Sequence, residues 1–100
     1  MLIGMAPVFR SGTIQPTDSE RDRDIKRLKQ LAKDRHLDIE QMYCAMENVE
    51  LWGSDTQEDF GRKKSVGAQV KMLYDEATLR LGHEDGLALA EKTIRAAEKE

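Results

Sequence analysis

The sequence has a single cysteine, Cys44, so it cannot form an internal disulfide bond. A fold without a disulfide does not need an oxidising compartment, and we expect a cytoplasmic protein. Aromatic residues are also scarce, at 5% of the chain, while 35% of the residues are charged. This composition is typical of the polar, helix-rich end of globular proteins.

Long hydrophobic runs are absent as well. The opening run, residues 1–9, is interrupted by Gly4 and Pro7, and no basic segment precedes it. A membrane-spanning helix needs roughly 20 apolar residues, and a secretion signal begins with a basic segment. We therefore expect neither export nor insertion into a membrane.

A chain of 100 residues suits one domain with a modest hydrophobic core. Residues 1–16 are broken up by two glycines and both prolines, which predicts an irregular N-terminal arm with at most a weak hairpin about Ser11 and Gly12. Residues 17–100 contain apolar residues at intervals of three and four, and we expect them to form a single helical domain.

This spacing divides the domain into four main helices. The first is expected at about residues 18–36, and the second follows the capping residue Asp38 and is stopped by Gly53. The third covers residues 66–81 and stops at Gly82, and the fourth occupies the remainder of the chain. Together they predict an all-α fold, a compact bundle or orthogonal array of about four helices with an irregular N-terminal arm.

Local details of these helices are also predicted. Gln41 completes a capping box at the start of the second helix, and Ser54 with Gln57 repeats the pattern before a single helical turn that puts Phe60 in the core. Gly86 is expected to weaken the first turn of the last helix. The buried stripe of the second helix should contain Ile39, Met42, Met46 and Val49, and the core should include Leu28, Met46, Leu73 and Ile94.

Residues suited to catalysis are few and carry no recognisable signature. His36 ends the first helix, where a cation suits the negative end of the helix dipole, and His83 after Gly82 has the same structural interpretation. Cys44 has no second cysteine at metal-binding or redox spacing. We therefore expect no enzyme activity, no cofactor and no metal site.

Charge is distributed unevenly along the chain. Residues 36–61 contain seven acidic residues and no lysine or arginine, although the whole chain has a net charge of only −3. Residues 1–35 instead carry eight basic and five acidic residues, and Arg62–Lys64 add three more positive charges. One explanation is that a basic helix packs beside an acidic one and that exposed ion pairs offset the charges.

A second explanation assigns a binding surface to the second helix. At 100° per residue, its acidic residues lie opposite the buried stripe, beside an aromatic and a leucine side chain. Such a face can bind a basic partner through apolar anchors within a negative rim. If the helix were buried on both faces, Tyr43 and Leu51 would belong to the core instead. The predicted partner-binding residues are Glu40, Tyr43, Glu47, Glu50 and Leu51.

This surface makes a non-enzymatic adaptor or inhibitor the first hypothesis for function, acting on a protein with a basic surface that normally holds nucleic acid. Carboxylates at helical spacing can take the place of phosphates on such a surface. In size and charge the chain is similar to small phage-encoded inhibitors of host nuclease systems, including anti-CRISPR proteins. We expect a monomer or a homodimer.

The stretch Leu28–Met46 resembles a repressor-type helix-turn-helix, with the small Ala32 in the first helix and apolar Leu37 and Met42 after the turn. It departs from that pattern at His36, where glycine is usual, and its second helix is acidic, which would repel DNA. A small DNA-binding or regulatory module is nevertheless the alternative, and an oligomer formed through the last two helices is a third hypothesis. The nucleic-acid-binding residues would then be Lys26, Lys29, Lys33, Arg62, Lys63 and Lys64.

Overall fold

Five helices form in residues 14–49 and 51–97, the part of the chain that the computed structural model describes. They are α1 (Asp18–Asp34), α2 (Ile39–Glu47), α3 (Ser54–Gly61), α4 (Val66–Leu81) and α5 (His83–Ala96). These residues contain no β-strand, so the predicted all-α class is confirmed. None of these helices is long and apolar enough to cross a membrane. The predicted hairpin about Ser11 and Gly12 lies outside the described residues.

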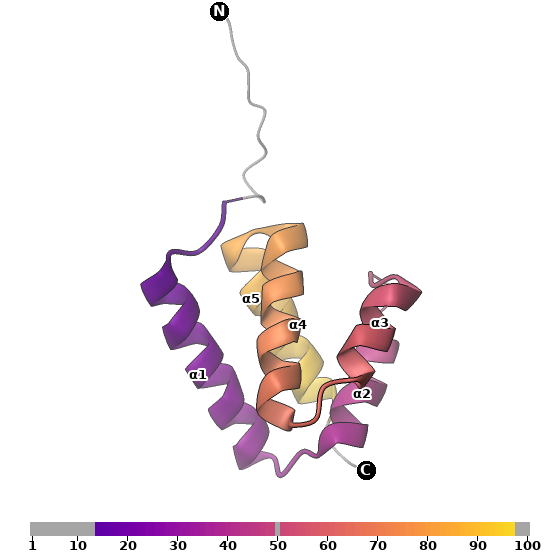
Figure 1. The fold of residues 1–100 in the computed structure, drawn as a ribbon. Helices are drawn as coiled ribbons and strands as arrows, with labels where there is room; N and C mark the ends of the chain where they lie inside the picture. Colours follow the sequence, from indigo (N-terminus) through magenta and orange to yellow (C-terminus); the bar gives the residue numbers. More distant parts are fainter. Residues whose placement is uncertain (1–13, 50, 98–100) are drawn as a thin grey trace, which may run out of the picture.

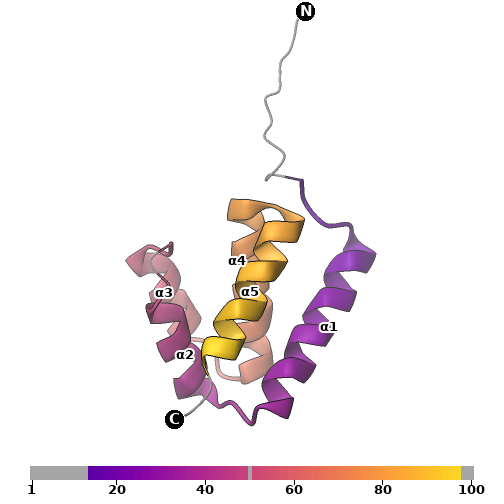
Figure 2. The same ribbon diagram turned by 180° about the vertical axis from the view of Figure 1, so that it is seen from behind.

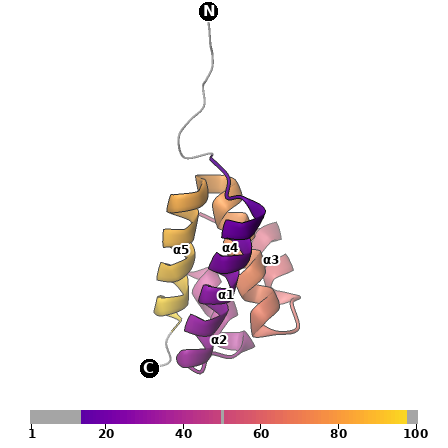
Figure 3. The same cartoon turned by 90° about the vertical axis from the view of Figure 1, so that its left-hand side faces the viewer.

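The helices α4 and α5 form the centre of the bundle. Gly82 alone joins them, and they run antiparallel side by side, as Figures 1 and 2 show from opposite sides. The helix α1 packs along both of them on one side, a contact that Figure 3 shows from the front. The helices α2 and α3 pack against the other side and against each other. The bundle therefore has two separate flanks resting on one central pair.

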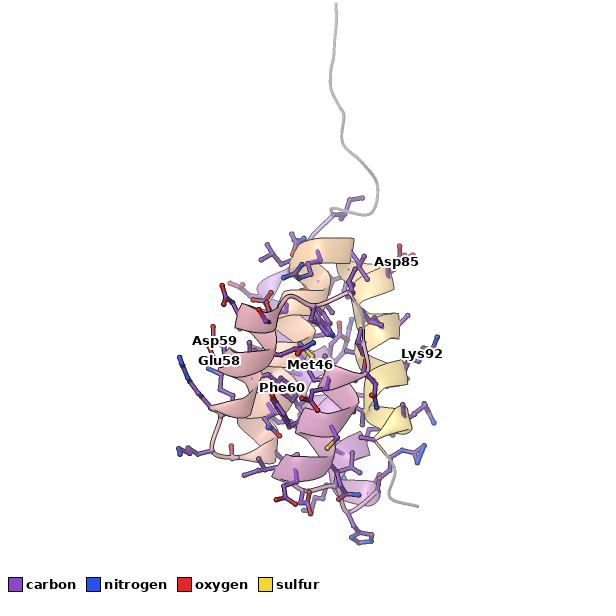
Figure 4. All side chains as sticks on the ribbon, turned by 90° about the vertical axis from the view of Figure 1, so that its right-hand side faces the viewer. Met46, Glu58, Asp59, Phe60, Asp85 and Lys92 are labelled. Atoms are coloured by element: carbon purple, nitrogen blue, oxygen red, sulfur yellow. The ribbon has the colours of Figure 1, made fainter. Side chains whose placement is uncertain are left out.

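One hydrophobic core connects these parts. The predicted core residues Leu28, Met46, Leu73 and Ile94 are all fully buried. Phe60 of α3 is also fully buried and lies toward Met46 in the interior, while Glu58 and Asp59 lie on the outer side of the same helix (Figure 4). The side chain of Phe60 thus anchors α3, as the sequence predicts.

Helix ends follow the capping chemistry of the sequence. Asp38 and Gln41 form the predicted capping box of α2, since the Gln41 amide donates to Asp38 Oδ1 at 2.8 Å and the Asp38 amide donates to Gln41 Oε1 at 3.0 Å. After α1, His36 has a left-handed backbone conformation with φ of 57°. The Leu37 and His36 amides donate to the carbonyls of Ala32 and Lys33, which is the Schellman arrangement of a helix end.

The predictions for the end of α2, for the start and length of α3, and for the burial of Ile39 are wrong. The helix α2 ends at Glu47, well before Gly53, because the chain must turn there to bring Trp52 into the core, where it is 5% exposed. Ser54 is the first residue of α3 and makes no cap; Gly53 precedes the helix without a side-chain hydrogen bond, and α3 has eight residues instead of a single turn. Ile39, predicted to be buried, is 37% exposed.

Gly86 has a positive role that the sequence analysis missed. A Cβ atom at this position would lie 2.5 Å from Cα of Thr78, so the first turn of α5 fits against the last turn of α4 only because residue 86 is glycine. Gly82, between the two helices, has φ of 90°, which favours glycine. The α4–α5 hairpin therefore depends on both residues.

Candidate functional site

An open groove of about 560 Å³ lies between α2 and α3. Three carboxylates surround an aromatic ring and a thiol in it, and we call it the acidic groove. Three of its lining residues belong to the set that the sequence analysis assigned to a partner. The full lining consists of Ile39, Glu40, Tyr43, Cys44, Glu47, Glu58 and Gly61.

The predicted partner-binding residues are only partly brought together. Glu40, Tyr43 and Glu47 all line the acidic groove, with both carboxylates exposed and the tyrosine half-buried. Leu51 is 43% exposed but does not line it, because α2 ends before residue 51. Glu50 lies outside the described residues. Tyr43 also packs against the hydrophobic core, so it takes part in both the core and the groove.

Sequence reasoning missed the part of the groove that α3 contributes. Glu58 is one of the seven acidic residues of the segment 36–61, and neither it nor Gly61 was assigned to a site. A Cβ atom on Gly61 would lie 2.8 Å from Cε1 of Tyr43, closer than real contacts allow. The glycine therefore lets the tyrosine ring lie directly against the backbone of α3.

The groove carries uncompensated negative charge. Neither Glu40 nor Glu47 forms an ion pair with any residue that the structure describes. Glu58 has a cationic neighbour, Arg62, whose Nη2 lies 3.6 Å from Glu58 Oε1. The pKa of the Tyr43 phenol is raised, first by desolvation and then by the charge of Glu47 and hydrogen bonding with it. The phenol thus stays protonated among carboxylates at neutral pH.

The basic residues of the alternative hypothesis lie elsewhere. Lys26, Lys29 and Lys33 are exposed along α1, and we call them the lysine face. The Lys29 side chain lies 3.4 Å from the position that a Cβ atom on Gly67 would take, so this face reaches the start of α4. Lys63 and Lys64 precede that start, with Lys63 half-buried and Lys64 exposed.

Two observations count against parts of this alternative hypothesis, one against a basic residue and one against the helix-turn-helix. Arg62 pairs with Glu58 and Asp59 of α3, so it belongs to the acidic flank. The Cα atoms of α1 and α2 also never come within 8 Å of one another, since each helix packs on the α4–α5 pair instead. A helix-turn-helix packs its two helices against each other across a short turn. The resemblance in sequence is therefore not matched in space.

A second polar group of residues was not predicted at all. Asp24 of α1 is 3% exposed, and its Oδ2 accepts a hydrogen bond from the Tyr74 hydroxyl at 2.9 Å and lies 2.8 Å from His83 Nε2. We call these three residues the Asp24 cluster. It joins α1, α4 and α5. The sequence shows only that Asp24 directly precedes the apolar Ile25, and this does not indicate that Asp24 is buried.

The segment before α1 is hydrogen-bonded to α4 and α5 close to the Asp24 cluster. The backbone amide of His83 donates to the carbonyl of Ile14 at 2.6 Å, and Gln15 Nε2 donates to the carbonyl of Thr78 at 2.7 Å. Burial and the hydrogen bond to Asp24 raise the pKa of Tyr74 well above its ordinary value. The sequence analysis explained His83 by a helix C-terminus, whereas the structure bonds its ring to Asp24. These contacts tie elements together and open onto no described groove.

No group of three or more His, Cys, Asp or Glu side chains in residues 14–49 and 51–97 is arranged to hold a metal ion. Comparisons of the chain with protein families, with curated proteins and with solved structures found no match.

Proposed function

We propose that the protein is a non-enzymatic adaptor or inhibitor that binds a basic surface of a partner protein through its acidic groove. The observation that carries this proposal is the pairing of two free carboxylates, Glu40 and Glu47, with the half-buried Tyr43 in one open groove. The carboxylates supply attraction and orientation, and the ring supplies contact area from which water is excluded.

The contrast with the arginines of α1 supports this assignment. Arg21 and Arg27 are neutralised by Asp75 of α4 and Glu91 of α5 at 3.0 Å and 2.7 Å. Glu40 and Glu47 have no such ion pair with a described residue, so their charge is available to an external cation. Inhibition follows if the partner's basic surface normally holds nucleic acid, as with anti-CRISPR proteins and other phage-encoded inhibitors of nuclease systems. A cytoplasmic monomer or homodimer is part of the same proposal.

The proposal is tested by capture from a lysate of the native host with three immobilised proteins. These are the wild type, the groove variant Glu40→Lys with Glu47→Lys, and the lysine-face variant Lys26→Glu with Lys33→Glu. A protein retained by the wild type and the lysine-face variant but lost from the groove variant supports the proposal, once size-exclusion chromatography shows a defined complex. Retention by the groove variant overturns it.

Nucleic-acid binding is the second candidate, favoured by the lysine face, whose three lysines form no ion pair with a described residue. Lysines spaced along one helix can neutralise phosphates, and such binding weakens steeply as salt rises. Arg62→Gln distinguishes the two candidates. It should strengthen protein binding at the acidic groove, because it removes the cation beside Glu58, and leave any duplex DNA binding by the lysine face nearly unchanged, because Arg62 lies on the acidic flank.

A further inference from the structure

The acidic groove combines an aromatic ring with carboxylates on two sides, and this combination indicates which chemical group it recognises. We propose that the groove binds an arginine side chain of the partner, with the guanidinium stacked on the Tyr43 ring and paired with Glu47 and Glu58. This inference rests on the proposed function, since it names the group through which a basic partner is held.

The first support is the way in which Tyr43 is positioned. Gly61 is the last residue of α3, and its φ is not in the left-handed region, so the backbone conformation does not require glycine there. Its small size serves the contact with Tyr43, because a Cβ atom would meet the ring at 2.8 Å. One edge of the ring is therefore fixed against α3, while the ring still lines the groove.

The second support is the placement of charge around that ring. Glu47 lies one helical turn after Tyr43 on α2, and Glu58 approaches from α3, so the phenol stands between carboxylates from two helices. A planar guanidinium can stack on an aromatic ring while its N–H groups donate to carboxylates at the ring's edge. An ammonium group is more strongly hydrated and offers no planar face.

The protein uses the same chemistry inside its own fold. The guanidinium of Arg80 lies 5.3 Å from the centre of the Trp52 ring, its Nε lies 3.6 Å from Glu76 Oε1, and its Nη2 donates to Thr56 Oγ1. Here an arginine of α4 lies over an aromatic residue, with a carboxylate and a hydroxyl at its edges. The acidic groove offers the ring and the carboxylates of such an arrangement without the arginine.

The test uses two small probes, acetyl-Ala-Arg-Ala amide and its matched lysine peptide, titrated into the labelled protein by NMR. We expect saturable shifts of the Tyr43 ring and of the Gly61 amide, with the arginine peptide binding about threefold more tightly than the lysine peptide. Tyr43→Phe should keep this preference because it keeps the ring. Tyr43→Leu should abolish the preference, and unchanged amide spectra elsewhere will show that each variant is folded.

The outcomes separate this inference from the proposed function. Equal binding of both peptides at the groove overturns the arginine assignment and leaves a general basic partner in place. Absence of any shift in the groove with either peptide contradicts both. An arginine preference that survives in Tyr43→Leu also overturns the stacking on Tyr43. Arg62→Gln provides an independent measurement and should tighten arginine binding, since Glu58 then has no internal cation beside it.

Discussion

Charged residues at the contact between α1 and the α4–α5 pair are bonded within the fold, whereas two carboxylates on the other flank have no ion pair with a described residue. On the α1 flank, Arg21 forms a two-pronged ion pair with Asp75, and Asp24 is buried between Tyr74 and His83. On the flank formed by α2 and α3, Glu40 and Glu47 face an open groove without an ion pair to a described residue. The first arrangement satisfies charges within the fold, and the second leaves them available to a partner.

This difference cannot be inferred from the number of charges on each helix. The helix α1 carries more charged residues than α2, yet its arginines reach across to α4 and α5 and are neutralised there. Position relative to the neighbouring helices decides whether a charge stabilises the fold or remains free for binding. Substitutions on the two flanks should therefore separate stability from binding.

The largest expected effect is in α4, on which both flanks rest. Leu73 is fully buried, and Leu73→Ala should lower the free energy of unfolding by about 2–5 kcal/mol through lost contacts and a residual cavity. The matched control is Leu79→Ala on the same helix, which should change it by about 0.5 kcal/mol or less because Leu79 is 66% exposed. Urea unfolding measures both. Equal effects would mean that α4 is rotated relative to this structure.

A smaller loss is expected on the α1 flank. Asp24→Ala leaves the Tyr74 hydroxyl and the His83 ring without their partner, which should cost about 1–3 kcal/mol of stability. Glu47→Ala in the acidic groove should cost about 0.5 kcal/mol or less, since an exposed carboxylate is removed. Thermal unfolding measures both variants. If Glu47→Ala is more destabilising than Asp24→Ala, then Glu47 stabilises the fold more than Asp24 does, and the contrast between the two flanks is wrong.

The smallest effect on stability is a dependence on alkaline pH. The folded protein raises the pKa of Tyr74 above the ordinary value of 10.0, so in that range the unfolded chain loses a proton that the folded chain keeps. Stability from this residue is fully present below pH 10.0 and is lost as the pH rises further. Tyr74→Phe should cost about 1 kcal/mol at neutral pH and flatten the decline above pH 10.0.

Unfolding of this variant and the wild type at neutral pH and just above pH 10.0 gives the comparison. Tyr43→Phe is the comparison, because the pKa of its phenol is also raised but the side chain is only half-buried, so it should flatten the decline less. An alkaline decline that is unchanged in Tyr74→Phe would show that the buried phenol is not its source.

Sequence patterns predicted the parts of the fold that depend on local chemistry. The spacing of apolar residues placed α1, α4 and α5, and Asp38 with Gln41 marked the start of α2. The early end of α2 was missed because it depends on Trp52 turning back into a core that the local sequence does not reveal. The role of Gly86 was missed for the same reason, since its contact with Thr78 joins two helices.

The candidate site was predictable only along one helix. Helical periodicity placed Glu40, Tyr43 and Glu47 on one face, because residues three and four apart share a side. The contributions of Glu58 and Gly61 depend on how α3 packs against α2. The spacing of residues within one helix does not indicate how two helices pack. The Asp24 cluster spans 59 residues of sequence and was invisible for the same physical reason.

The central claim is that the carboxylates of the acidic groove serve binding and not folding. It is tested most directly by measuring, on the double variant Glu40→Lys with Glu47→Lys, both the melting temperature and the association rate with the captured partner. We expect the melting temperature to stay within about 4 °C of the wild type, while association slows by roughly tenfold or more. An unchanged association rate in a folded double variant would contradict the claim and direct attention to the lysine face.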